Sequence, residues 1–170
     1  MKNIIKLVFA IAAIALCSTV SAQTLKLAHI NMDELIVSMP EYEMASVELQ
    51  GIARNLEEEI ELMTVEFNRR LEDFQRNGEN FTEIVRQSRQ QELVSLQQRI
   101  QSFQEGAQEQ MQIDQHRLMQ PIIEKATKAI EDVAKEQGIT YVFTDQAIIF
   151  KAVGTLDLLP SVKQHLGIRN

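Results

Sequence analysis

Residues 49–85 read LQGIARNLEEEIELMTVEFNRRLEDFQRNGENFTEIV. Their apolar positions step by three, four and four residues, so that Leu49, Ile60 and Leu71 are eleven apart. Eleven residues in three turns is about 3.67 residues per turn, which is close to the natural winding of an α-helix. The segment therefore predicts a long, nearly straight helix with one apolar stripe, ended by a turn at Asn77-Gly78.

The eleven-residue repeat resumes after this turn, because Val85, Leu96, Ala107 and Leu118 are again eleven apart. Two such runs on either side of one turn predict two long helices that fold back on each other with their stripes in contact. We expect the seam of this hairpin to consist of Leu49, Ile52, Leu56, Ile60, Met63, Phe67, Leu71, Phe74, Val85, Leu93, Leu96, Ile100, Phe103, Ala107, Met111 and Leu118.

The repeat also has weak points. Arg89 and Asp114 stand where the pattern would place an apolar side chain. Gly51 and Gly106 lie within the helical runs, where each glycine costs ~1 kcal/mol relative to alanine. These breaks predict a bendable arm, although Gly106 would equally permit a close approach of the two helices.

Short strands flank the helical runs. Residues 25–31 and 139–144 are extended in pattern, and 147–151 would pair back on 139–144 as a hairpin after Asp145-Gln146. Pro121 should kink the second helix or open a new one, Gly138 should end it, and 158–166 should form a short terminal helix. Three strands bury too little apolar surface to stand alone. We therefore expect several chains to share one core formed by Leu27, Ile30, Ile139, Val142, Phe143, Ile148, Ile149 and Phe150; the pattern does not give the copy number.

The N-terminus has the features of a cleaved export signal. Lys2 and Lys6 precede an apolar run from Leu7 to Leu16, and Val20-Ser21-Ala22 carries small residues where a signal peptidase reads, which predicts cleavage after Ala22. A membrane anchor is disfavoured because a span needs about 20 apolar residues. A lipoprotein signal at Cys17 is disfavoured because Leu16 stands where a small residue is required.

Composition excludes several classes of function. The formal net charge is −7 and becomes −9 without Lys2 and Lys6, so the mature chain should repel nucleic acid. The single cysteine leaves with the signal. The chain has no GxxxxGK phosphate loop, and His29, His116 and His165 lack the spacing of metal ligands. We therefore expect no enzyme, no metal site and no cofactor.

Segments at both ends of the mature chain are distinctive: AHINMDEL at 28–35 and MPEY at 39–42, then AIEDVAKEQGITYVF at 129–143 and GTLDL at 154–158. These segments give the chain a resemblance to the Skp/OmpH family of periplasmic chaperones for outer-membrane proteins. It implies an α+β, mostly helical fold: a homotrimer shaped like a jellyfish, with a small shared β body and long antiparallel helical hairpins around a cavity. The corresponding segments are a signal peptide at 1–22, an oligomerisation body at 23–43 and 121–170, and the hairpin arm at 44–120.

The resemblance further implies that unfolded outer-membrane β-barrel proteins are held between the arms without ATP. Scattered apolar side chains off the seam would give such clients many weak, shape-tolerant contacts. The candidates are Leu62, Val65, Ile84, Val94, Ile113 and Met119. Well-known members of the family are basic, and this acidic chain departs from them, which counts against binding to lipopolysaccharide. The alternative function is a periplasmic coiled-coil adaptor that binds one specific folded partner through a contiguous apolar patch.

Overall fold

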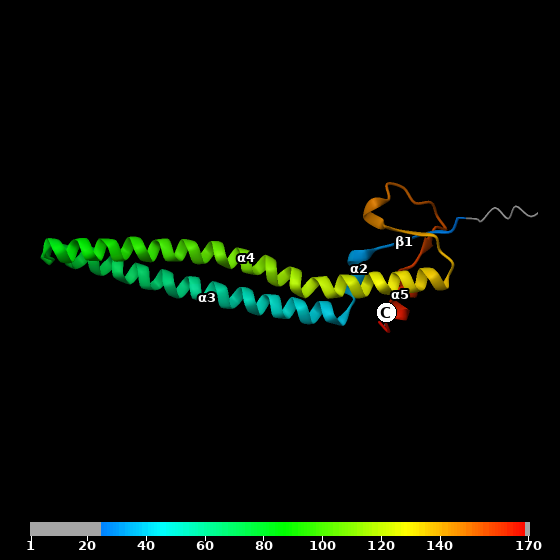
Figure 1. Ribbon diagram of the computed structural model, residues 1–170, viewed down its shortest axis with the longest axis horizontal. Coiled ribbons are helices and arrows are strands. Elements are labelled where there is room, and N and C mark those ends of the chain that lie inside the picture. Colours follow the sequence, from blue (N-terminus) through cyan, green and yellow to red (C-terminus); the bar gives the residue numbers. More distant parts are fainter. Residues whose placement is uncertain (1–24, 169–170) are drawn as a thin grey trace, which may run out of the picture.

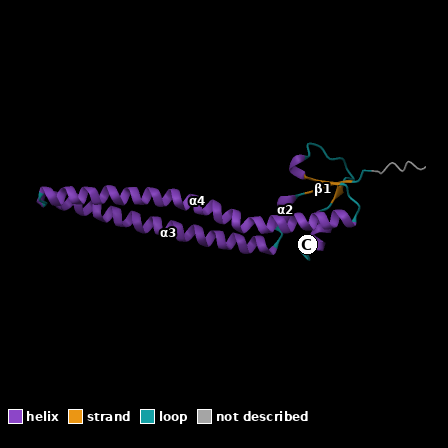
Figure 2. Cartoon of the chain, in the orientation of Figure 1, coloured by secondary structure: helices purple, strands orange, loops and turns teal. Residues whose placement is uncertain are grey.

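A helical hairpin projecting from a small mixed body dominates the fold (Figure 1). The computed structural model describes residues 25–168, so the predicted signal peptide lies outside the described residues. Helices α3 (Pro40–Asn77) and α4 (Glu83–Glu136) form the hairpin, and the 3-10 turn η2 (Gly78–Asn80) joins them at the tip. The strands lie at the other end of the molecule (Figure 2). The mostly helical fold with a small sheet is confirmed, as is the turn at Asn77-Gly78.

The ends of the long helices follow from local chemistry. Pro40 occupies the first turn of α3, where its missing N–H costs no hydrogen bond. The carboxylates of Glu41 and Glu43 in the same turn interact favourably with the positive end of the helix dipole. Helix α4 is followed by Gly138 in the left-handed region at φ +64°, which is the predicted glycine stop.

Pro121 does not open a new helix. Helix α4 runs through it without interruption from Glu83 to Glu136, and Figure 1 shows the helix bent in its yellow-green part, on the arm side of the body. Proline removes one hydrogen bond within a helix and bends it. The predicted boundary between arm and body at residue 120 therefore falls inside one continuous helix.

The sheet is parallel, and the predicted C-terminal hairpin is wrong. Strands β1 (Leu27–Ile30), β2 (Tyr141–Thr144) and β3 (Leu156–Asp157) lie in the order β2-β1-β3, and β1 pairs in parallel with both neighbours. Residues 147–151 form no strand; the 3-10 turn η3 (Asp145–Ala147) and a loop carry the chain across to β3. A parallel return needs a crossover connection, which a two-residue turn cannot provide.

The body has a hydrophobic core within one chain, in which helices supply most of the apolar surface that covers the strands. Ala28 and Ile30 of β1 pack on the C-terminal part of α4, and the helices α2 (Met32–Val37) and α5 (Leu159–His165) close the core from other sides. Ile30, predicted in the shared core, is only 1% exposed inside its own chain. The fully buried larger side chains are Ile30, Leu35, Met39, Leu158 and Val162.

Candidate functional site

The seam of the arm is built from the repeat. Met63 and Leu96 are buried between α3 and α4, and most of the other predicted seam residues are half-buried. Val85 differs, because it is 40% exposed in the first turn of α4, at the tip where the seam ends. A narrow, half-covered stripe of this kind is what two helices without a third layer can bury.

Asp114 is the polar break that the repeat marked, and it is buried with partners. Its side chain accepts hydrogen bonds from Gln110 Nε2 at 2.8 Å and from Arg117 Nε at 3.1 Å. Arg117 Nη2 also donates to Glu48 Oε1 of α3 at 3.1 Å, which links the two helices. The hydrogen bonds from Gln110 and then Arg117 lower the pKa of Asp114, so the carboxylate stays ionised in the seam.

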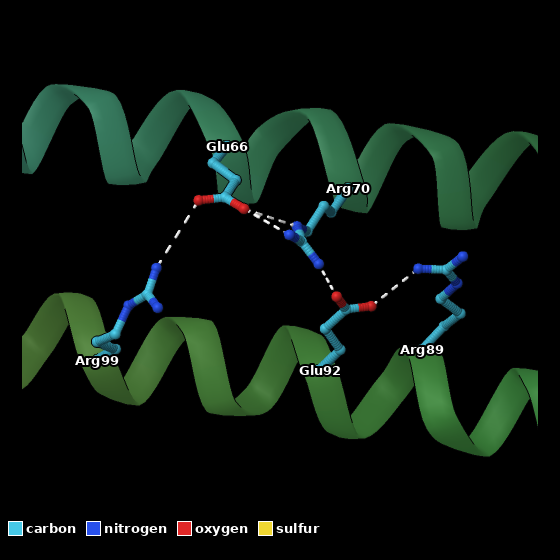
Figure 3. Close-up of polar contacts among 5 residues, drawn as sticks. All are labelled: Glu66, Arg70, Arg89, Glu92 and Arg99. Carbon is cyan, nitrogen blue, oxygen red and sulfur yellow. Dashed lines mark hydrogen bonds and ion pairs between the residues drawn. The ribbon is translucent and has the colours of Figure 1, made fainter.

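Arginine and glutamate side chains bridge the helices farther along the arm (Figure 3). Arg70 Nε donates to Glu66 Oε1 at 3.0 Å and its guanidinium also pairs with Glu92 of α4. Arg99 of α4 lies 3.7 Å from Glu66, and Arg89 pairs with Glu92 at 3.0 Å. Exposed pairs of this kind contribute only ~0–1 kcal/mol each, so they align the helices more than they hold them together. Sequence reasoning missed this cluster, although Glu66 and Arg70 have the i,i+4 spacing of helix ion pairs.

Apolar side chains off the seam are dispersed along the arm. Leu62, Val65, Val94 and Ile113 are exposed, and Ile84 near the tip is 81% exposed. Met119 differs from this predicted set, because it is half-buried and packs against the core of the body. Two further exposed apolar residues of α3, Met44 and Val47, were not singled out, although they too lie off the stripe.

The two helix glycines of the arm have open space around them. A Cβ atom added to Gly51 or to Gly106 would meet no other atom within 4 Å. Gly106 therefore does not serve a close approach of the helices, which corrects one of the two alternatives. Bending of the arm remains the proposed reason for glycine at these positions.

Replacing Gly51 and Gly106 by alanine is expected to stabilise the arm by ~1 kcal/mol per site, because alanine restricts the unfolded chain and meets no clash. Urea unfolding followed by helical circular dichroism measures this change. Gln98→Ala, at an exposed position of α4, the helix that contains Gly106, serves as the control with a much smaller expected gain. A loss of stability in either glycine variant would contradict the open geometry.

The centre of the body sheet carries a buried histidine. His29 Nδ1 lies 2.8 Å from Asp145 Oδ1, and Asp145 Oδ2 accepts a hydrogen bond from Lys151 Nζ at 3.0 Å. Lys151 and then His29 lower the pKa of Asp145 through these hydrogen bonds. The three side chains join β1 to both ends of the segment 145–151. Within residues 25–168 no group of three or more His, Cys, Asp or Glu side chains could hold a metal ion.

One face of the body sheet is only partly covered in the single chain: His29 is buried there, but the apolar side chains beside it are exposed. Leu27, Tyr141 and Phe143 are exposed on adjacent strands, and the Tyr141 and Phe143 rings stack with centroids 6.4 Å apart. The loop after η3 adds Ile149, Phe150 and Val153, all almost fully exposed. Ile139, Val142 and Ile148 are half-buried, and the first two pack on the chain's own core. The exposed members of the predicted oligomer core thus gather at this face and loop.

The comparisons with known proteins agree with this architecture. The solved structure of an OmpH-like candidate outer membrane chaperone from Caulobacter crescentus CB15 superposes with a TM-score of 0.73 at 10% sequence identity, covering 82% of each chain. At this identity the likeness shows the fold alone. No curated protein sequence gives a significant match. Among residues 25–168, no helix is both long and apolar enough to cross a membrane.

The family comparison is more direct than the structural one. The sequence pattern of the family described as "Outer membrane protein (OmpH-like)" matches residues 26–166, which include the whole arm and nearly all of the described body. The match extends over far more than half of the chain. The protein therefore belongs to the OmpH-like family.

Proposed function

We propose that this protein is an ATP-independent holdase chaperone of the periplasm, which binds unfolded outer-membrane proteins and prevents their aggregation. The observation that carries the proposal is the set of dispersed, exposed apolar side chains along a hairpin arm that projects from a separate body. Membership of the OmpH-like family supports it, as does the fold shared with a protein described as a candidate outer membrane chaperone.

The assembly in this proposal is a homotrimer. The exposed apolar side chains at this face, with Tyr141 and Phe143 on the edge strand β2, would pack against the same region of two further chains. Burying an exposed aromatic side chain contributes about 1.5–3 kcal/mol, and six large apolar side chains of each chain lie at this face and loop. Three arms would then project in one direction and enclose a space.

Clients in this proposal meet the arms at many small apolar sites. Separate contacts by Leu62, Val65 or Ile84 each contribute a small part of the binding free energy, and different clients can use different combinations of them. Binding therefore does not require a particular client sequence. Bending at Gly51 and Gly106 would let the arms fit clients of different size. The acidic arm surface argues for polypeptide clients over anionic lipid or nucleic acid.

Light scattering of a refolding outer-membrane β-barrel protein tests the function. The mature protein is expected to suppress scattering at about one trimer per client, with no nucleotide present. If scattering is unchanged, the holdase proposal fails and the adaptor alternative is favoured. A folded soluble protein heated to aggregation serves as a second client, and suppression there too would indicate binding that is not limited to one partner.

A further inference from the structure

Two adjoining grooves follow one side of the hairpin. The larger, of about 690 Å³, has an apolar floor that includes Leu56, Ile60 and Met111. The smaller, of about 350 Å³, continues toward the body from the shared residues Ala53 and Met111 to Met119. The two together extend along α4 from Gln104 to Met119, which is about 22 Å at 1.5 Å per residue. The small side chains Ala53 and Ala107 leave this space between the helices.

Glutamines border these grooves in register with the eleven-residue repeat. Gln97, Gln101 and Gln104 recur eleven residues later as Gln108, Gln112 and Gln115. The last four of these six line the grooves, and Glu57 is the single charged residue among the lining residues. The groove lining therefore carries one negative charge, although helix α3 as a whole is strongly acidic, with ten acids and four bases from Pro40 to Asn77.

The glutamine side-chain amides of α4 that line the grooves are available for hydrogen bonds. Gln101, outside the grooves, donates to Glu105 at 3.3 Å, and Gln110 donates to Asp114 at 2.8 Å. In the described part of the chain, the amides of Gln104, Gln108, Gln112 and Gln115 make no hydrogen bond to another protein group. Each glutamine amide offers two donor hydrogens and one acceptor oxygen.

We propose that this glutamine-bordered groove binds an extended segment of an unfolded polypeptide, with the amides hydrogen-bonded to the client's backbone and the apolar floor covering alternate client side chains. The inference rests on the proposed holdase function and deepens it by naming the groove and the feature of the client that it recognises. A strand of an outer-membrane barrel fits this chemistry, because its side chains alternate between apolar and polar.

The spacing of the amides matches an extended chain. Residues four apart on a helix rise ~6.0 Å, and residues two apart on a strand rise ~6.6 Å. From Gln104 through Gln108 to Gln112 the mismatch accumulates to only ~1.2 Å by these figures, which flexible glutamine side chains absorb. Every second backbone amide of the client then faces a glutamine, and the side chains on one face of the client point to Leu56, Ile60 and Met111.

The neutral amide explains why an extended backbone is favoured over a charged or folded partner. A glutamine side chain donates to a carbonyl and accepts from an N–H with equal ease, so the row is indifferent to the client's sequence. A folded partner has its backbone groups already paired, and an anionic partner would find no cation in either groove. An unfolded strand offers both the unpaired backbone and the alternating side chains.

The test compares two triple variants of the mature full-length protein. Gln104→Ala/Gln108→Ala/Gln112→Ala removes the amides at the groove, and Gln87→Ala/Gln91→Ala/Gln98→Ala removes three exposed amides that line neither groove. Alanine is a better helix former than glutamine, so both variants should fold. The probes are two fluorescein-labelled ten-residue peptides of one composition, with apolar residues alternating in one and grouped in a block in the other.

The groove variant is expected to bind the alternating peptide about tenfold more weakly, since three hydrogen bonds of modest net value are lost. The control variant should bind it as the wild type does, and the wild type should prefer the alternating peptide to the blocked one. Equal binding by the two variants, or no preference between peptides, would overturn the groove inference while wild-type suppression of aggregation leaves the holdase proposal intact. If the wild type neither binds peptide nor suppresses aggregation, the holdase proposal itself fails, and the groove inference fails with it.

Discussion

The mature protein is expected to sediment at three times the mass of its chain, and the double variant Phe143→Glu/Phe150→Glu is expected to sediment as a single chain. Both side chains are exposed in the isolated chain, one on the sheet and one in the loop that follows it. At the proposed trimer interface each substitution would bury a carboxylate without a partner. Such burial costs several kcal/mol per charge, and the interface would contain six of them.

The structure predicts that the same variant keeps its fold, because neither residue belongs to the core between β1, α4 and α5. Helical circular dichroism should therefore match the wild type. Ile84→Glu at the tip of the arm is the control: it places a carboxylate at another exposed apolar site, far from the body, and it should remain trimeric. A wild-type protein that sediments as one chain would refute the shared body, and a trimeric double variant would refute this face as the interface.

Local rules accounted for the hairpin and failed for the sheet. The eleven-residue repeat and the stops at Asn77-Gly78 and Gly138 are set by residues close in sequence, so the long helices could be predicted from them. The partner of a strand is not encoded locally. Ile148-Ile149-Phe150 has the composition of a strand, yet β2 pairs with β1 alone, and the chain leaves β2 through η3 into a loop that contains these residues.

The candidate site divides in the same way. The repeat distinguishes the seam from the off-seam side chains on any one helix, which is why Leu62 and Ile84 are exposed as their positions suggest. The repeat does not show which other part of the protein packs against a helix at a given point along its length. Met119 is off the stripe, but the body packs against it, and Val85 is on the stripe, but the hairpin ends there. The position of Asp114 in the seam could be predicted from the repeat. The bond from its partner Arg117 to Glu48 could not, because it depends on how α3 and α4 lie side by side.

Replacing Leu62, Val65, Ile84 and Val94 together by serine is expected to weaken suppression of client aggregation at least tenfold. All four side chains are exposed on the arm and none belongs to the core. Each apolar side chain contributes roughly 1.5–3 kcal/mol when a partner fully buries it, and partial burial of four such groups exceeds the 1.4 kcal/mol that a factor of ten requires. Light scattering of a refolding β-barrel protein, titrated with the variant, measures the loss.

The control for this experiment must introduce serine at four exposed positions of the arm without the apolar loss; its helix penalty is at least as large, because Glu and Gln are better helix formers than Val and Ile. Serine at Glu58, Gln75, Gln90 and Gln98 meets that need, because these polar residues are also exposed on α3 and α4. Both variants should retain trimeric mass and similar helicity, so a difference in suppression reports on client contact alone. If the apolar variant protects the client as well as its control does, contact does not depend on these four positions, and the glutamine-bordered groove becomes the stronger candidate for the surface that holds the client.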